Sequence, residues 1–446
     1  MYTLYSWLTA AGMILLSPYF LIRGLANGKY LRNIAERLGW RFPAELKSGD
    51  NGAIWIHAVS VGEVLAVLPL ATQLKQTFPR RRLVISTTTM TGQQLALQRL
   101  QCADAIFYFP LDWKGPVTRA IKAARPAIVA IVETEIWPNF LRECRRAGVP
   151  VVFVNGRLSE RSCRGYLRAL RWSGGMLQGF LRTILNDATL FLMQSAQDAA
   201  RLLTLGADAS RVTVAGNLKY DLATPPETPL SAWLQKYLTL QTSRPILVAG
   251  SVMANEEAQV LRAFAGVRRD FPDALLILAP RKPDRFDGAA AVVSASGQRL
   301  VRRRDLTLNG TGNASLAEPG AVLLLDSLGE LADIYRLADA VFVGGSLVAT
   351  GGHNILEPAA FSKVPIYGPS MENFREMAAK FLEAGAAIQV KDSEELAAAW
   401  KSLLRDRARA QRMGAAAREL VDRNHGATSR VLTHIADIVD SPRGRA

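Results

Sequence analysis

Carboxylates that follow apolar runs are the first residues of this sequence that could do chemistry. Glu63 belongs to HAVSVGEVLAVLPL, directly after the run 53–57, where a strand is expected to give way to a helix. It is either a first-turn carboxylate favoured by the helix dipole or a general base, which would need burial to keep its pKa high enough. Glu133 and Glu135 follow the run 127–132 in VETEIWPNF and share a face of extended backbone. They indicate a ligand or divalent-metal site, or else a cluster that caps a helix.

Basic side chains form a second group. Five arginines recur at alternating steps of four and three residues, so a helix would place them in one stripe: Arg157, Arg161, Arg164, Arg168 and Arg171. Such a stripe is either an ordinary solvated face or a surface for phosphate groups, which arginine binds in bidentate geometry. Lys219, in GNLKYD, lies just ahead of a proline-rich segment and is either solvated or directed into a cleft.

Three loops in the second half of the chain suit a nucleotide. APRKPDRF places Arg281 after an apolar run, and DSLGEL opens a helix after another. The segment 343–361, VGGSLVATGGHNILEPAAF, has two glycine pairs ahead of a helix expected near Asn354. Free backbone N–H groups at such a helix start favour phosphate, and Glu357 could accept two ribose hydroxyls. A glycine-rich loop alone can be an ordinary turn, but three such loops at one sheet edge indicate a nucleotide site.

Alternating apolar runs and helical stretches must position these residues. Strands are expected in the first half at 53–57, 83–87, 127–132, 151–155, 190–194 and 212–215, with helices such as 63–76 and 91–100 between them. Strands are expected in the second half at 246–249, 275–279, 322–325, 340–344, 364–367 and 387–390. The proline-rich TPPETP predicts a linker. The pattern predicts two doubly wound, Rossmann-like α/β domains, 28–223 and 231–446, joined by a linker at 224–230 and facing a cleft that binds ligands.

The N-terminus lacks charge from residue 2 to residue 22, and Arg23 carries the first charge. A signal peptide would need a basic segment ahead of the apolar run, which is missing, and a buried helix of a soluble domain remains the alternative. We expect residues 1–27 to form an uncleaved membrane-anchor helix that spans the bilayer or lies in its interface. Six basic and two acidic residues between Arg23 and Lys47 predict that this flank and the rest of the chain are cytoplasmic.

The composition limits the classes of partner that the protein can bind. The 446 residues carry 54 Lys and Arg against 39 Asp and Glu, a net charge of +15, which indicates an anionic partner. In an anchored protein, that charge favours anionic lipid over nucleic acid. Three cysteines and four histidines without CxxC spacing predict neither a disulfide framework nor a zinc site. Without a DxD sequence, we expect no metal at the donor site and no cofactor.

Six of these segments resemble, in the same order, the motifs of the 3-deoxy-D-manno-octulosonic acid (Kdo) transferases: HAVSVGE, VETEIWPN, NGRLSERS, GNLKYD, APRKPDRF and GGSLVATGGHNILEPAAF. The resemblance covers nearly the whole chain. It implies a two-domain GT-B fold and inverting transfer of Kdo from CMP-Kdo to the lipid A precursor, lipid IVA, in lipopolysaccharide biosynthesis. It also implies a location at the cytoplasmic side of the bacterial inner membrane.

Residue by residue, the resemblance makes Glu63 the general base and has Glu133 and Lys219 stabilise the transition state. It implies that CMP lies against Pro280, Arg281, Leu328, Gly329, Glu330, Asn354, Ile355, Leu356 and Glu357. The arginine stripe from Arg157 to Arg168 would bind phosphates of the acceptor or of lipid. Two other functions remain possible from the sequence: a UDP-sugar enzyme of similar architecture, either another glycosyltransferase or an epimerase, and a non-catalytic membrane-bound lipid-binding protein.

Overall fold

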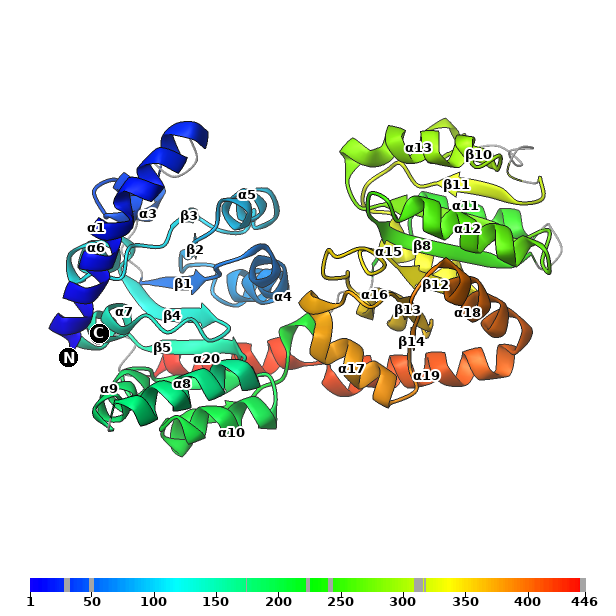
Figure 1. Ribbon diagram of the computed structural model, residues 1–446. Helices are drawn as coiled ribbons and strands as arrows, with labels where there is room; N and C mark the ends of the chain where they lie inside the picture. Colours follow the sequence, from blue (N-terminus) through cyan, green and yellow to red (C-terminus); the bar gives the residue numbers. More distant parts are fainter. Residues whose placement is uncertain are drawn as a thin grey trace. The chain divides into compact units, whose positions relative to one another are not determined.

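The computed structural model describes residues 1–27, 33–47, 52–173, 175–221, 225–239, 244–308, 316 and 318–441. The chain forms two compact units (Figure 1). The first unit contains Met1–Asp221 and Asn424–Ala446, and the second contains Leu222–Arg423.

The first unit is built on a parallel sheet of seven strands in the order β3-β2-β1-β4-β5-β6-β7. Its strands are β1 Ala53–His57, β2 Leu83–Thr87, β3 Ala105–Tyr108, β4 Pro126–Val132, β5 Val151–Gly156, β6 Leu190–Met193 and β7 Val212–Val214. Its helices are α1 Tyr2–Asn27, α2 Ile34–Arg37, α3 Ala44–Lys47, α4 Val61–Thr77, α5 Met90–Arg99, α6 Lys114–Ala124, α7 Pro138–Arg146, α8 Glu160–Trp172, α9 Met176–Leu185, α10 Ala196–Thr204 and α20 Ala427–Asp440, with 3₁₀ turns η1 Ala209–Arg211 and η2 Leu218–Tyr220.

The second unit repeats this plan with the strand order β10-β11-β9-β8-β12-β13-β14. Its strands are β8 Ile246–Val252, β9 Leu275–Pro280, β10 Arg299–Arg302, β11 Ala321–Leu324, β12 Ala340–Val343, β13 Pro365–Tyr367 and β14 Ile388–Gln389. Its helices are α11 Pro229–Thr239, α12 Glu257–Arg268, α13 Phe286–Ala295, α15 Leu331–Ile334, α16 Leu356–Ala359, α17 Arg375–Glu383, α18 Ser393–Arg405 and α19 Arg407–Asn424, with 3₁₀ turns η3 Pro283–Arg285, η4 Arg303–Asp305, η5 Tyr335–Leu337 and η6 Glu372–Phe374.

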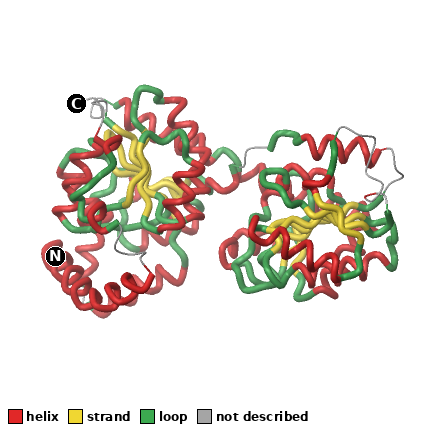
Figure 2. Tube along the Cα trace, turned by 90° about the horizontal axis from the view of Figure 1, so that it is seen from above, coloured by secondary structure: helices red, strands yellow, loops and turns green. Residues whose placement is uncertain are grey.

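Helices cover both faces of each sheet (Figure 2). In the first unit, Trp55 and Phe153 belong to the core on one face, whereas Ile56 and Val154 belong to the core on the other. Strands buried on both sides must be apolar at every position, which is why their sequences are continuous apolar runs. The predicted doubly wound α/β architecture is confirmed in both units.

The strand order reverses once in each sheet. In the first unit the reversal lies between β1 and β4, and in the second between β8 and β12. At such a point the loops after the two strands diverge to opposite faces, which leaves a crevice at the carboxyl ends where ligands bind in doubly wound folds. Glu63 lies in the first turn of α4, the helix that follows β1, and the loop after β4 carries Glu133 and Glu135.

Twelve strands lie where the sequence predicts them, with ends that differ by at most three residues. Two strands, β3 and β10, were not predicted. Both are four-residue strands at a sheet edge, and β10, with the sequence RLVR, has two apolar residues between two arginines. Edge strands are covered less than central ones, and β10 accordingly lacks the continuous apolar run that identified the others. Strand β3, AIFY, is apolar throughout but only four residues long.

The C-terminal helix α20 belongs to the first unit. Its residues Val431, Ile435 and Val439 lie in the same hydrophobic core as residues of β1 and α4. The Asp221 carboxylate accepts hydrogen bonds from the backbone N–H groups of Gly426 and Thr428 at the start of α20. The second domain, expected to run to residue 446, therefore ends at residue 423 in the structure, because the apolar face of α20 is buried against the first sheet.

The N-terminal helix α1 is docked on the first unit through polar groups. The hydroxyls of Tyr2 and Tyr5 donate hydrogen bonds to Asp187 and Asp112, and the Trp113 indole N–H donates one to Thr9 at 3.2 Å. Burial raises the pKa of Asp112 to about 6, although the hydrogen bonds from the backbone of Asn139 and Phe140 and from the Tyr5 hydroxyl oppose this shift. Within the described part of the chain, no helix combines the length and the apolarity needed to cross a membrane.

Candidate active site

Glu63 lies at the reversal point of the first sheet and is buried. Helix α4 begins at Val61, and the Glu63 carboxylate turns back to accept hydrogen bonds from the Val59 N–H and the Ser60 hydroxyl, both at 2.8 Å. These two bonds fix its side chain at the start of the helix. Burial raises the pKa of Glu63 to about 7, assisted by the nearby charges of Glu133 and Glu135 and opposed by the two hydrogen bonds. A base at a helix start needs burial to keep its pKa high, and Glu63 is buried. A carboxylate with a pKa of about 7 can accept a proton near neutral pH.

The neighbouring strand β4 ends in an unusual backbone conformation at Glu133. Its φ of 58° lies in the left-handed region, which a glutamate rarely adopts, and its N–H donates to the Val154 carbonyl at 2.9 Å. Such a conformation costs free energy and is concentrated at functional sites. Burial raises the pKa of Glu135, and the charge of Glu133 raises it further. Both carboxylates are therefore close enough to Glu63 to influence its protonation.

Lys219 lies in η2, the turn that follows β7, and is half-buried. The Asn217 side chain accepts a hydrogen bond from the Lys219 N–H at 2.9 Å. Because all seven strands are parallel, the turn after β7 lies at the same edge of the sheet as Glu63 and Glu133.

The predicted arginine stripe is present in part. Arg161, Arg164, Arg168 and Arg171 lie on α8 and are exposed, and Arg164 forms an ion pair with Glu160 at 3.2 Å. Arg157 does not belong to this stripe. It precedes α8, is half-buried, and donates its N–H to the Thr134 hydroxyl at 3.0 Å, beside Glu133. The helix begins only at Glu160 because Ser159 caps it, accepting the N–H of Ser162.

In the second unit, the three predicted loops follow β9, β11 and β12. Arg281 follows β9 directly, and its N–H donates to the Val252 carbonyl at 2.9 Å. In the turn after β11, Leu328 is 73% exposed and Gly329 has a φ of 87°, which glycine adopts without strain. The Glu330 carboxylate accepts hydrogen bonds from the Arg303 guanidinium at 3.0–3.1 Å. Glu330 is thus paired with an arginine that the sequence did not identify.

The segment from Asn354 to Glu357 forms a helix start, although α16 begins two residues later than predicted, at Leu356. The Asn354 side-chain oxygen accepts the Leu356 N–H at 3.1 Å. Burial raises the pKa of Glu357, while its hydrogen bond from Asn354 and the charge of Arg281 lower it. Asn354, Glu357 and Arg281 therefore belong to one local electrostatic environment.

The backbone N–H groups of both glycine pairs ahead of this helix start have acceptors within the second unit. The backbone N–H groups of Gly345, Ser346 and Leu347 donate to the Glu256 carboxylate at 2.7–3.0 Å, and so does the N–H of Met253. The second pair is also occupied, since Gly351 donates to the Ser370 hydroxyl and Gly352 to the Gly345 carbonyl.

Sequence reasoning missed Glu256. It is fully buried and lies 89 residues before the loop that it holds. The one sequence signal for it is that Glu256 and Glu257 follow an apolar run, as Glu63 does. Glu256 acts as an internal anion in the nest of N–H groups after β12, so a bound phosphate would have to contact other groups.

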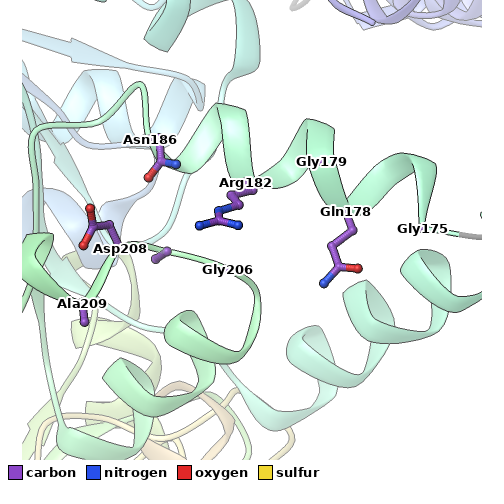
Figure 3. Close-up of a pocket in the computed structure, with 9 residues that line it drawn as sticks. Gly175, Gln178, Gly179, Arg182, Asn186, Gly206, Asp208 and Ala209 are labelled. Atoms are coloured by element: carbon purple, nitrogen blue, oxygen red, sulfur yellow. The ribbon is translucent and has the colours of Figure 1, made fainter.

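A pocket of about 630 Å³ lies elsewhere in the first unit (Figure 3). It is lined by Gln178 and Arg182 of α9, by Asn186 directly after that helix, and by residues 206–209 ahead of β7. These residues lead into β6 and β7, so the pocket is at the end of the sheet opposite to Glu63 and Lys219. It does not coincide with the candidate active site.

Two solved structures share this fold at low sequence identity. A putative UDP-N-acetylglucosamine 2-epimerase from Listeria monocytogenes aligns with a TM-score of 0.53 at 15% identity, over 88% of this chain and 97% of that one. MurG from Acinetobacter baumannii aligns with a TM-score of 0.52 at 15% identity, over 87% of this chain and 100% of that one. At this identity the likeness shows the fold alone.

Sequence relatives are far more similar. The family described as 3-deoxy-D-manno-octulosonic-acid transferase (kdotransferase) matches residues 32–222, and the family glycosyl transferases group 1 matches residues 318–420. The 3-deoxy-D-manno-octulosonic acid transferase of Haemophilus influenzae is 33% identical over 411 residues, 91% of each chain. That of Bordetella pertussis is 35% identical over 418 residues, 90% of each chain. This chain therefore belongs to the 3-deoxy-D-manno-octulosonic acid (Kdo) transferase family of glycosyltransferases.

Proposed function

We propose that the protein transfers Kdo from CMP-Kdo to the lipid A precursor lipid IVA, with inversion at the sugar carbon, as a step of lipopolysaccharide biosynthesis. The observation that carries the proposal is Glu63, a buried carboxylate with a pKa of about 7 at the reversal point of a doubly wound sheet. Membership of the Kdo transferase family identifies Kdo as the transferred sugar. The site contains a carboxylate that can activate the acceptor hydroxyl for attack on that sugar.

In the proposed reaction, Glu63 accepts the proton of the acceptor hydroxyl as that oxygen bonds to the sugar carbon and the bond to the CMP phosphate breaks. One base on the face opposite to the leaving group is sufficient for inversion. The Val59 N–H and the Ser60 hydroxyl hold the carboxylate in one orientation. Glu133 and Lys219 act on the developing charges, with Lys219 stabilising negative charge on the leaving phosphate.

For the donor, we propose that CMP contacts Pro280 and Arg281, the turn Leu328–Glu330, and the helix start Asn354–Glu357. Arg281 would offset the phosphate charge, and the buried Glu357 would accept ribose hydroxyls. Since Glu256 and the loop itself use the N–H groups of both glycine pairs, Arg281 has the larger part in holding the phosphate. No metal is proposed, and among the described residues no cluster of three or more acidic, histidine or cysteine side chains has a metal-site arrangement.

A donor and acceptor assay tests this function. The full-length protein is incubated with CMP-Kdo and a tetra-acylated precursor in the presence of EDTA, and the lipid product is identified by mass. We expect a product heavier by one or more Kdo residues and a matching release of CMP. UDP-sugars serve as the control donors. Transfer from a UDP-sugar instead, or no CMP release with acceptor present, would contradict the proposal, and activity that returns only with added magnesium would contradict the metal-free donor site.

We also propose that the protein attaches to the cytoplasmic side of the inner membrane through the outer face of α1. The tyrosines Tyr2 and Tyr5 of this helix are turned to the first unit, whereas Leu4, Trp7 and Leu8 are 54%, 75% and 64% exposed. Leu15 is 79% exposed as well. A helix that directs hydroxyls inward and leucine and tryptophan outward suits the interface of a bilayer. The exposed arginines of α8 would add attraction to anionic lipid headgroups.

Replacing Trp7 and Leu8 by serine is expected to reduce co-sedimentation with anionic vesicles and transfer to vesicle-embedded acceptor. Transfer to detergent-dispersed acceptor should change little, because the inward contacts of Tyr2 and Tyr5 are kept. Leu97→Ser is the matched control, since Leu97 on α5 is 60% exposed but lies outside α1. Equal vesicle binding by the double variant and the wild type would rule out this face of α1 as the attachment surface.

A further inference from the structure

Three side-chain amides connect the carboxyl ends of β5, β6 and β7 in the first unit. Asn155 is in β5, Gln194 directly follows β6, and Asn217 follows β7. The Gln194 side-chain amide donates a hydrogen bond to the backbone carbonyl of Asn155, and its oxygen accepts one from the Asn217 side-chain amide, each at 3.0 Å. Asn217 in turn accepts the Lys219 N–H at 2.9 Å. These bonds form a continuous path from β5 to Lys219.

Asn155 also reaches the turn of Lys219 directly. Its side-chain oxygen accepts the Leu218 N–H at 3.0 Å, although the two residues are 63 positions apart. Strand β7 is two strands away from β5, so this bond draws the turn after β7 back across the sheet. The residue before Asn155, Val154, accepts the N–H of Glu133. The turn of Lys219 is thereby held to the strand that neighbours Glu133.

The geometry of Asn155 is specialised for this contact. The residue is fully buried and has a φ of 56°, in the left-handed region that asparagine tolerates better than most residues. In this conformation the side chain can accept the Leu218 N–H while its own carbonyl accepts from Gln194. A buried N–H left without an acceptor costs free energy, so the contact holds the turn in one position.

The same turn is attached on its other side to the C-terminal helix. The Arg430 guanidinium donates to the Ala215 carbonyl at 2.7 Å, and Asp221 caps α20. These bonds explain how α20 is fastened, but they end at residues 215 and 221. The amide path ends at the backbone of Leu218 and Lys219 themselves, which a role in fastening α20 does not require.

We propose that Asn155, Gln194 and Asn217 are positioning residues that hold Lys219 at the carboxyl edge of the sheet for the transfer reaction. The inference rests on the proposed function of Lys219 at this site. Their hydrogen bonds fix the backbone of the turn from which the Lys219 side chain extends, and in this way they act on the reaction through Lys219.

A double-mutant cycle between Asn155 and Lys219 tests the proposal. Asn155→Gly removes the side-chain acceptor and keeps a residue that adopts the left-handed conformation without strain. We expect its kcat to fall by about 10- to 100-fold, as when a catalytic group is misplaced, with little change in the KM for CMP-Kdo. In a Lys219→Met background, Asn155→Gly should cause no further fall, because the group that it positions is gone. Equal falls in both backgrounds, or no fall in either, would overturn the proposal.

Two comparisons separate positioning from general stability. Asn217→Asp keeps the oxygen that accepts the Lys219 N–H but loses the amide that donates to Gln194, so its activity should lie between those of Asn217→Ala and the wild type. Thr189→Ala removes a similar side-chain acceptor, for the Val151 N–H at 3.1 Å, at the other end of β5. We expect this change to leave kcat at the wild-type level, whatever it does to the melting temperature. A fall in kcat that matches that of Asn155→Gly would contradict the proposal.

Peptide-resolved hydrogen exchange distinguishes failure of the network from failure of the proposed function. Asn155→Gly should speed exchange of the segment 216–221 at least 10-fold and leave the segment 151–153 near the wild-type rate. If the wild type transfers no Kdo, the proposed function fails, while faster exchange at 216–221 still supports the amide path. Unchanged exchange at 216–221 would contradict the path whether or not the enzyme transfers Kdo.

Discussion

Glu63→Gln is expected to lose about 10²–10⁴-fold in turnover, the usual contribution of a positioned general base. The amide is nearly isosteric with the carboxylate, so its oxygen can still accept from the Val59 N–H or the Ser60 hydroxyl. Because those contacts are local to the first unit, CMP binding should remain at the wild-type level. The measurement is single-turnover transfer from CMP-Kdo, together with CMP binding by calorimetry. Near-wild-type turnover would remove Glu63 from the mechanism.

The pH dependence gives an independent check on the same carboxylate. A base with a pKa of about 7 must lose its proton to act, so the wild-type rate should rise with pH up to about 7 and then level. Glu135→Gln removes one of the charges that raise the pKa of Glu63, and it should move the rise to lower pH. A profile that is flat between pH 5 and pH 8 would show that another group accepts the proton.

The raised pKa of Glu63 also predicts how the stability of the fold changes with pH. The folded-state pKa of Glu63, about 7, is above its ordinary value of 4.5, so folding favours the protonated form. Its favourable contribution to stability is present below about pH 4.5 and is lost as the pH rises through 7. Glutamine has no charge to bury, so Glu63→Gln should raise the melting temperature relative to the wild type more at pH 8 than at pH 5.

Glu256→Ala is expected to lower the stability of the second unit by on the order of 3 kcal/mol or more, because it leaves several buried N–H groups without an acceptor. Those groups belong to Met253 and to the loop from Gly345 to Leu347. Since this loop precedes Asn354 and Glu357, CMP affinity should fall as well. Thermal unfolding and CMP calorimetry measure the two effects.

Glu257→Gln is the matched control for Glu256. Glu257 is the next residue and is equally buried, but it pairs with Arg285 at 3.0 Å and not with the loop. We expect it to reduce stability while CMP affinity is largely kept. If both variants lose CMP affinity to the same extent, the loss reflects general destabilisation and not the loop that Glu256 holds.

Much of the candidate site was predictable because its residues follow strands directly. In a parallel sheet each carboxyl end lies at the same edge, so the spacing of Glu63, Glu133 and Arg281 from their apolar runs was enough to place them there. The value of the Glu63 pKa was not predictable, since it depends on burial and on the distant carboxylates of Glu133 and Glu135. The use of the glycine-rich N–H groups by Glu256 was also hidden, because it depends on β8 lying beside β12.

By itself, the sequence determined the two α/β domains, nearly all of their strands, the family and the residue types at the strand ends. These features depend on local spacing: continuous apolar runs form buried strands, and the residue after a run is at the sheet edge. Only the tertiary structure decided that α20 returns to the first unit, that Arg157 lies off the arginine stripe, and that Asn155 holds the turn of Lys219. Each of these depends on which distant segments become neighbours. Strand order and helix packing decide which segments are neighbours. Many strand orders satisfy the same local sequence pattern, and the packing of the folded core selects one of them.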